Sequence, residues 1–349
     1  MITNRERMAA TLAGELVDYV PAWPMGFFNA ALAAQLVPAD RLAVDLNYYP
    51  AEGRYGFAAH PVAELERARA FNLYIDRVAL AVGWGANFAF GHAGPGEFNS
   101  QVVAATPEGF IIEYETGARE RHNLVPQFTH PASRPVRTLA DLEALTLPDP
   151  DDPTRWQGFA EDVAYLKAAG EYTVGWVNGC FSGCHYFFCD YQDLLVALIE
   201  QPELVTRLMA RLGDWNLRAA RQMLAAGVDC IGFVDDLGSS KNLLISPRLY
   251  RQYFWPWHRA LVELAHGYGA AVHMHSHGNI NLVLDDIVAT GVDMLNPLDP
   301  TEGMDLAGLA DRYPRLTLVG GMDKYLFDPP TEAIEAQLRR SIAACRGRG

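Results

Sequence analysis

The stretch VDCIGFVDD, residues 228–236, is followed after a helix-length segment by AAVHMHSHG, residues 270–278, and this pair decides the fold class. Each stretch is short and mostly apolar, and each ends in acidic residues or glycine, as strands buried on both faces do. Between them a helix is expected to begin after the N-cap Ser246, with Pro247 at its first position, and to be kinked or broken at Pro256. This order predicts parallel strands joined by a right-handed crossover.

The same pattern continues on both sides of this unit. Strands are expected at VPAWPMG, LYIDRVALAVGWG, YTVGWVNG, VDMLNPLD and LTLVGGMD, and helices over about 202–226 and at INLVLDDIVAT. These strands and the two above make seven. We therefore predict an α/β protein with a single (β/α)8 barrel of TIM type over residues 1–349, with its last strand missing from this chain. The stretch QVVAATPEGFIIEYETGARERHNLV, residues 101–125, alternates apolar and polar residues and predicts a hairpin that turns at 107–109.

Charge and composition exclude several classes of function. The chain of 349 residues has 28 basic and 42 acidic side chains and a net charge of −14, which disfavours nucleic acids and anionic membranes as partners. The N-terminal stretch MITNRERMAATLAGE lacks the apolar core of a signal peptide, and no apolar run approaches the length of a membrane span. Five cysteines, an odd number, argue against a disulfide framework. We expect a cytoplasmic protein, and a homodimer is compatible with the sequence.

Three histidines, His273, His275 and His277, alternate along the second quoted stretch. Alternate residues of a strand share one face, and the end of a barrel strand is where active sites of this fold lie. Two interpretations of His275 and His277 stay open at this point. They are a pair of metal ligands, or they form a polar strand end that is hydrogen-bonded to its neighbours. The deeper His273 is expected to support the pair or to belong to the core.

Other candidate site residues end the remaining strands. Asp236, which follows Asp235, and Asp323 in the stretch GGMDK are candidates for acid/base work, with helix or loop capping as the alternative. The expected substrate-binding wall consists of Trp23, Phe27, Trp84, Trp176, Asn178, Cys180, Asn296 and Met322. The spacing of Cys180, Cys184 and Cys189 is unlike that of a zinc ribbon, so these cysteines are expected in the pocket wall.

Four stretches together resemble the uroporphyrinogen decarboxylase superfamily, in the same order and over nearly the whole chain. They are NRERMAATLAGELVDYVPAW, FVDDLGSSKNLLISPRLYRQYFWPWHRAL, HSHGNI followed by GVDMLNPLDP, and LTLVGGMDK. The resemblance implies a single (β/α)8 barrel and one of two chemistries. One is the decarboxylation of uroporphyrinogen without a cofactor, and the other is zinc-dependent methyl transfer to or from a corrinoid protein. In the methyltransferases a third zinc ligand comes from a last strand and loop, which would follow TEAIEAQLRRSIAACRG.

The two branches differ at positions that can be compared. The decarboxylases carry an arginine-rich segment after their first strand and a catalytic aspartate after their second. Here PAWPMGFFNAALAAQL contains no basic residue, and VALAVGWG, residues 78–85, contains no acid. The methyltransferases carry a His-x-Cys-Gly-Asn segment that supplies two zinc ligands. The stretch HSHGN matches it with His277 in place of the cysteine, a substitution that zinc accepts.

The sequence and the resemblance together predict a zinc-dependent methyltransferase. It would move a methyl group between a small substrate or acceptor, such as a methoxylated aromatic compound, and a corrinoid (cobalamin) bound to a partner protein. His275 and His277 would hold the zinc, and Asp236 or Asp323 would complete the site or act as acid and base. The third ligand and the identity of the methyl donor and acceptor stay open. The alternatives are a metal-free decarboxylase of a smaller acid, with the histidines as proton donors, and a non-catalytic binding barrel.

Overall fold

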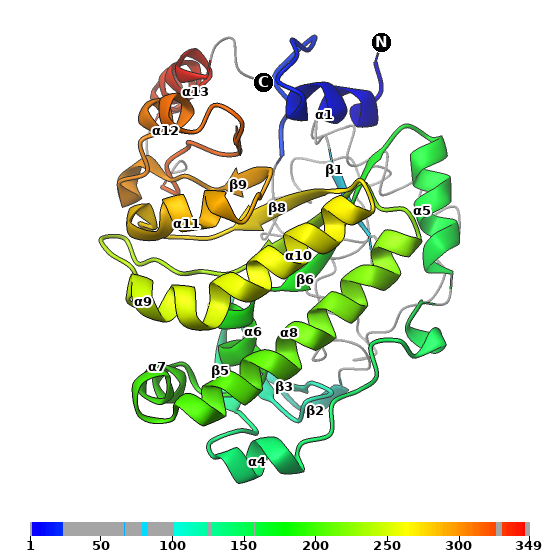
Figure 1. Ribbon diagram of the computed structural model, residues 1–349, viewed down its shortest axis with the longest axis vertical. Coiled ribbons are helices and arrows are strands. Elements are labelled where there is room, and N and C mark those ends of the chain that lie inside the picture. Colours follow the sequence, from blue (N-terminus) through cyan, green and yellow to red (C-terminus); the bar gives the residue numbers. More distant parts are fainter. Residues whose placement is uncertain are drawn as a thin grey trace.

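The computed structural model of the protein describes residues 2–23, 66, 79–82, 101–124, 127–156, 158–325 and 330–345. Two sheets stand out in this part of the chain: a six-stranded parallel sheet flanked by helices and a four-stranded antiparallel sheet (Figure 1). Phe27 and Trp84, which the sequence assigned to the substrate-binding wall, lie outside the described residues.

The parallel sheet has the strand order β1-β6-β7-β8-β9-β10, and every neighbouring pair is parallel. Its strands are β1 (Ala79–Val82), β6 (Tyr172–Asn178), β7 (Cys230–Val234), β8 (Ala271–His275), β9 (Met294–Asn296) and β10 (Thr317–Leu318). The predicted α/β class and the parallel pairing are confirmed. Each of these strands also lies within a stretch that was predicted as a strand from the sequence. Of the expected strand VPAWPMG, only the first four residues are described, and among them only Ala22 forms a bridge.

Helices on the outer face of the sheet supply most of the core. The long helix α8 (Pro202–Ala225) contacts β6, and α10 (Trp255–Gly267) contacts β8 and lies beside α8 (Figure 1). The other helices are α1 (Asn4–Leu12), α4 (Leu139–Ala144), α5 (Phe159–Ala168), α6 (Cys180–Phe187), α7 (Tyr191–Glu200), α9 (Pro247–Leu249), α11 (Leu284–Ala289), α12 (Leu306–Arg312) and α13 (Thr331–Ala344). Among the described residues, we find no helix whose length and apolar character would let it cross a membrane.

Alternation along the strands divides the buried side chains into two clusters. Val177 and Phe233 point to the helices and belong to the large outer cluster. Val174 and Trp176 point to the other face, where they pack with Cys230 and further residues of a smaller inner cluster. The period of two that defines a strand thus produces two apolar layers, which explains why these strands are apolar throughout.

The expected interruption at Pro256 takes the form of a π turn, Tyr250–Phe254, between α9 and α10. Proline lacks the backbone N–H that an α-helix needs at this point, and its ring clashes with the carbonyl of the preceding turn. A wider turn just before Pro256 relieves both problems while the chain stays helical. The predicted N-cap is confirmed, because the Ser246 side chain accepts a hydrogen bond from the backbone N–H of Leu249.

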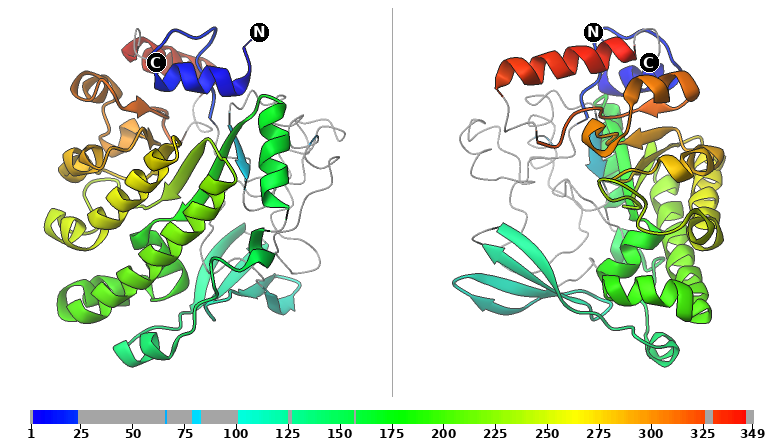
Figure 2. Two further views of the ribbon diagram at one scale, coloured as in Figure 1. Left: turned by 45° about the vertical axis from the view of Figure 1, so that its right-hand side comes forward. Right: turned by 90° about the vertical axis from the view of Figure 1, so that its left-hand side faces the viewer.

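The antiparallel sheet extends the predicted hairpin into a four-stranded meander with the order β2-β3-β4-β5. Its strands are β2 (Gln101–Thr106), β3 (Gly109–Glu113), β4 (Arg119–Leu124) and β5 (Gln127–Ser133), and the sheet lies to one side of the parallel sheet (Figure 2). The turn between β2 and β3 is confirmed. β5 was not expected, because the predicted hairpin ended at residue 125. β5 contains Pro131, which an edge strand tolerates because one of its sides needs no partner.

Candidate active site

The carboxyl ends of β7, β8 and β9 bring the main site candidates together. In the sheet register Val234 pairs with His275, and His275 pairs with Asn296. Asp235 and Asp236 directly follow β7, so the acidic pair lies next to the end of the histidine-bearing strand. Parallel strands end at one edge of the sheet, which is where ligands bind in folds of this type.

His275 has one ring nitrogen engaged and the other free. Its Nδ1 lies 2.5 Å from Oδ1 of Asn296, and Nδ2 of Asn296 donates to the carbonyl of Val319 at 3.3 Å. Because the amide nitrogen is used on Val319, the amide oxygen faces His275, so Nδ1 carries the proton and Nε2 carries the lone pair. Burial is the main cause that lowers the pKa of His275, so the ring is neutral at pH 7.

His277 lies beyond the strand and is more open. Its side chain is 45% exposed, whereas that of His275 is 7% exposed. The two rings lie 4.8 Å apart between centroids at an angle of 76°. The backbone N–H of His277 donates to Oδ1 of Asp236 at 2.8 Å, and the same oxygen lies 3.7 Å from Nε2 of His275. Asp236 therefore links the two histidines.

A third carboxylate, Glu302, reaches the site from the loop after β9, and the sequence reasoning missed it. Its Oε2 accepts from the N–H of Gly278 at 2.8 Å and lies 4.0 Å from Nδ1 of His277. Its Oε1 accepts from Nζ of Lys324 at 2.6 Å, and this bond is the main cause that raises the pKa of Lys324. Glu302 could have been found by extending the strand-end argument past Asp299 to the next acid of the same loop.

The two adjacent aspartates have different surroundings. Asp236 is 28% exposed and its N–H donates to Oγ of Ser182 at 2.9 Å. Asp235 is fully buried, with its carboxylate bonded to Nε2 of His258 and to the N–H of Ser182, both at 2.7 Å. Of the two aspartates, only Asp236 faces the histidine pair. Asp236 is also the one that the sequence analysis named as the acid/base candidate.

The other acid/base candidate, Asp323, makes a local contact. Its Oδ1 accepts from the N–H of Tyr325 at 2.8 Å, as in a turn. The chain turns directly after β10 through Gly320 and Gly321, which have φ angles of 118° and 76°, and the N–H of Gly321 donates to the carbonyl of Pro297. Met322 follows this turn and is partly buried. The carboxylate that the structure brings to His277 is Glu302.

The expected pocket wall divides into two groups. Trp23 and Trp176 flank the ring of His273, with centroid distances of 4.7 and 5.3 Å. His273 is fully buried, and among the described residues neither of its ring nitrogens has a hydrogen-bond partner. Burial, followed by the charge of His275, lowers its pKa to about 3. This agrees with the expected core position of His273 and places Trp176 in the inner cluster.

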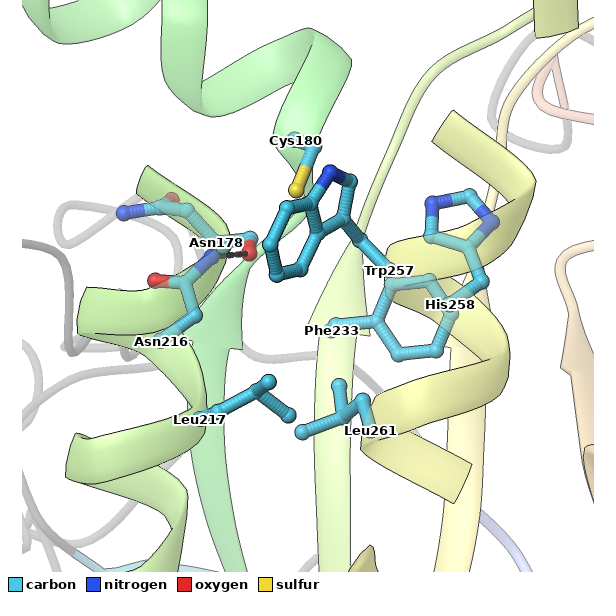
Figure 3. A pocket seen from close by; sticks show the side chains of 10 residues that line it. Asn178, Cys180, Asn216, Leu217, Phe233, Trp257, His258 and Leu261 are labelled. Carbon is cyan, nitrogen blue, oxygen red and sulfur yellow. Dashed lines mark hydrogen bonds between the residues drawn. The ribbon is translucent and has the colours of Figure 1, made fainter. Parts of the chain in front are cut away.

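Asn178 and Cys180 line a separate, very small cavity between β6, α8 and α10 (Figure 3). The backbone carbonyl of Asn178 accepts from Nδ2 of Asn216 at 2.7 Å, and Trp257 fills the space between the helices. Trp257 is therefore part of the core, and a side chain on Gly213 would collide with its ring. Burial raises the pKa of the Cys180 thiol, so it stays protonated and is a poor metal ligand.

The donor types at the strand ends suit a divalent metal in part. The free Nε2 of His275, the exposed ring of His277 and the carboxylates of Asp236 and Glu302 are nitrogen and oxygen ligands that zinc accepts. Within the part of the chain that the structure describes, no three His, Cys, Asp or Glu side chains are already arranged around one metal position. The strand ends thus bring together donor types that zinc accepts, without a three-residue metal position among the described residues.

Two glycines let the histidine loop approach the loop after β7. Gly278 has a φ of 89°, and a Cβ there would lie 2.1 Å from the carbonyl carbon of Gly238. The N–H of Gly238 donates to the carbonyl of His277 at 3.1 Å. The backbones cross so closely that only glycine fits, and this crossing holds His277 above Asp236.

We expect Gly278→Ala to lower the free energy of unfolding by about 2 kcal/mol, because the new Cβ meets backbone that cannot move aside. Gly267→Ala is the matched control, since a Cβ at Gly267 meets nothing within 4 Å. It should change stability by less than about 0.5 kcal/mol. Urea unfolding of the two variants and the wild type measures both effects. Equal stability of both variants would contradict the tight crossing.

The fold and the strand-end cluster define an α/β protein of the class in which ligands bind at the carboxyl ends of parallel strands. Residues 123–349 match the family described as Uroporphyrinogen decarboxylase (URO-D), and the chain belongs to that family. It is 27% identical to the uroporphyrinogen decarboxylase of Alkalilimnicola ehrlichii over 229 residues, which cover 62% of this chain and 60% of that protein. It is 21% identical to that of Geobacter sulfurreducens over 260 residues, covering 72% and 70%.

A methyltransferase from Methanosarcina mazei has a similar structure. The TM-score is 0.67 at 16% sequence identity, and the match covers 100% of this chain and 92% of that one. At this identity the likeness shows a shared fold. The predicted superfamily is confirmed by the family match over residues 123–349, and family and fold together imply a barrel of TIM type. The match to the first relative spans less than two thirds of that protein's length.

Proposed function

We propose that this protein is a zinc-dependent methyltransferase that moves a methyl group between a small substrate and a corrinoid carried by a partner protein. The observation that supports it best is the pairing of His275 and His277. Their rings lie 4.8 Å apart at the end of β8, with carboxylates within about 4 Å of the ring nitrogens. The fold shared with the Methanosarcina mazei methyltransferase is consistent with this branch of the family.

The architecture and location in this proposal follow the sequence analysis. The six described parallel strands would belong to one barrel domain of (β/α)8 type that includes residues 1–349. The protein would work in the cytoplasm, where a corrinoid protein can dock at the strand ends. A homodimer is compatible with this arrangement.

Each residue of the site has a role in the proposal. Nε2 of His275 and the ring of His277 would bind the zinc, and Asn296 would keep His275 in the tautomer that leaves Nε2 free. Asp236 and Glu302 are the carboxylates nearest to these nitrogens and would complete the set. When bound, zinc supplies a Lewis acid that polarises a methylated oxygen or lowers the pKa of a thiol acceptor.

The substrate class follows from the donor set and the aromatic side chains. Ligands with nitrogen and oxygen atoms make a harder, more positive zinc than thiolates do, which suits an ether or alkoxide oxygen. Trp23, which is partly buried and lies against His273, offers an apolar surface on the inner face of the sheet. A methoxylated aromatic compound satisfies both features.

The experiment mixes the purified, zinc-loaded protein with reduced cobalamin and a panel of methoxy, methylamine and methylthio donors. Methylcobalamin should appear in the cobalt absorbance with at least one methoxy donor. The reverse reaction, from methylcobalamin to thiol or folate acceptors, tests the other direction. Absence of any spectral change in both directions would overturn the methyltransferase proposal.

A second candidate, a decarboxylase, is favoured by the names of the curated relatives. In this chain the histidines would donate protons to a smaller acid. Two features oppose it. Burial lowers the pKa of His275, so at pH 7 the ring is mostly without the extra proton that it would have to donate. The segment PAWPMGFFNAALAAQL has no basic residue to bind a polyanion. We expect no coproporphyrinogen from uroporphyrinogen. Formation of coproporphyrinogen would favour the decarboxylase. Absence of activity in every assay would favour a non-catalytic binding barrel.

A further inference from the structure

We propose that Asp235 is a positioning residue whose buried carboxylate sets the location of Asp236 and of the end of β8. This role rests on the proposed function, because a misplaced Asp236 or His275 would weaken the proposed metal site. The proposal rests on a chain of hydrogen bonds that joins helices α6 and α10 to the strand ends. Asp235 itself does not face the histidine pair.

The carboxylate of Asp235 is bonded on both oxygens. Oδ1 accepts from the backbone N–H of Ser182 in the first turn of α6, and Oδ2 lies 2.7 Å from Nε2 of His258 on α10. The side chain is fully buried. A buried carboxylate needs such partners, because removing one leaves a buried polar group without compensation. The Asp235 carboxylate is thus held in place by hydrogen bonds to both α6 and α10.

Gly179 makes room for this carboxylate. It precedes α6 as its N-cap and offers no side chain to cap the helix. A Cβ at Gly179 would lie 2.3 Å from Cγ of Asp235 and 2.4 Å from the carbonyl oxygen of Val234. Asp235 therefore occupies the space of the missing capping side chain and caps α6 from the neighbouring strand.

Ser182 passes this constraint on to Asp236. Its N–H is held by Asp235, and its Oγ accepts from the N–H of Asp236 at 2.9 Å. The N–H of Asp235 also donates to the carbonyl of His275 at 2.8 Å. One hydrogen bond thus joins Asp235 to the backbone of His275. Two hydrogen bonds in series, through Ser182, join the Asp235 carboxylate to the backbone N–H of Asp236. A shift of the Asp235 carboxylate must move the 3.7 Å separation between Asp236 and Nε2 of His275.

His258 is itself oriented from the π turn. Its Nδ1 lies 3.1 Å from the hydroxyl of Tyr250, which is fully buried and opens that turn. Nε2 of His258 faces the Asp235 carboxylate, and a ring with its one proton on Nε2 accepts a hydrogen bond from the Tyr250 hydroxyl at Nδ1. The side chains of His258 and Asp235 therefore connect Tyr250 in the π turn to the end of β7.

The test compares Asp235→Asn with Asp229→Asn as a matched control. Asp229 precedes β7 at the opposite end of the same strand, and its carboxylate is also bonded on both oxygens: Oδ2 accepts from the N–H and the hydroxyl of Thr173, and Oδ1 accepts from Nε of Arg5. Both variants should lower the melting temperature. If Asp235 positions the site, only Asp235→Asn should also change readouts that report on His275 and the metal.

Two readouts are needed. In metal-free protein, nitrogen-15 spectra of the imidazole rings should show shifted His275 signals in Asp235→Asn and unchanged ones in Asp229→Asn. In zinc competition with a chelator, Asp235→Asn should bind about ten- to a hundredfold more weakly, and Asp229→Asn within about threefold of wild type. Wild-type His275 signals and zinc affinity in Asp235→Asn would overturn the proposal. If the wild type itself binds no zinc, the proposed function fails while the spectra still decide the role of Asp235.

His258 provides a second pair of variants in case Asp235→Asn does not fold. The side-chain amide of His258→Gln can still donate to Asp235, whereas His258→Leu cannot. We expect the glutamine variant to keep His275 signals and zinc affinity within about threefold of wild type, and the leucine variant to lose affinity about tenfold or more. Identical behaviour of the two variants would contradict a positioning role that acts through this hydrogen bond.

Discussion

Bound zinc is expected to fall from about one equivalent per chain to near zero when His275 and His277 are both replaced by alanine. Methyl transfer should then drop by at least about a thousandfold, because a Lewis acid contributes several kcal/mol to such a transition state. The two rings carry the free nitrogens of the site, and the nearest carboxylates, Asp236 and Glu302, cannot replace both. Elemental analysis and the cobalamin absorbance assay measure the two effects.

The matched control for this prediction is His266→Ala. His266 ends α10 and its ring lies 2.9 Å from Asp293, which precedes β9 at the opposite end of the strands from the site. This variant should keep wild-type zinc content and activity. Metal retained by the double variant, with an unchanged melting temperature, would show that the metal is bound elsewhere and would remove the basis of the proposed site.

The second large effect concerns stability in acid. In metal-free protein, His273 alone should lower the free energy of unfolding by roughly 3 kcal/mol between pH 7 and pH 4.5. Its pKa is lowered to about 3 in the folded state by burial, while the unfolded chain has the usual value of about 6.5. Below about pH 6.5 the His273 ring binds a proton in the unfolded chain but stays neutral in the folded protein. Stability is therefore complete above about pH 6.5 and falls as the pH drops towards the folded pKa.

The measurement is urea unfolding of wild type and His273→Leu at pH 7, 5.5 and 4.5. His122 and His185, whose pKa values are lowered to about 4 by burial, act in the same direction but are present in both proteins. The difference between the two pH profiles therefore isolates His273. Parallel profiles would mean that His273 is not buried as a neutral ring.

The parallel sheet could be predicted because its strands carry their own signal. Each of β6, β7, β8 and β9 lies within a short apolar run, and such runs form strands only where both faces are covered. The helix ends were predictable for the same local reason: the Thr3 and Glu6 capping box and the Ser246 cap depend on residues three positions apart. β5 escaped prediction because it lies beyond the predicted hairpin, and its position at the edge of the sheet, where its proline is tolerated, is a tertiary property.

The local pattern of apolar runs was enough to predict which residues end the strands, and so to expect His275, His277 and Asp236 at one edge. The contacts around these residues depend on packing between distant segments. Glu302 reaches His277, and His258 reaches Asp235, from segments more than twenty residues away. Alternation along a strand tells which face a side chain takes, but it contains no information on distances between loops. Those distances follow from the packing of α6 and α10 against the sheet and from the glycine crossing beside His277.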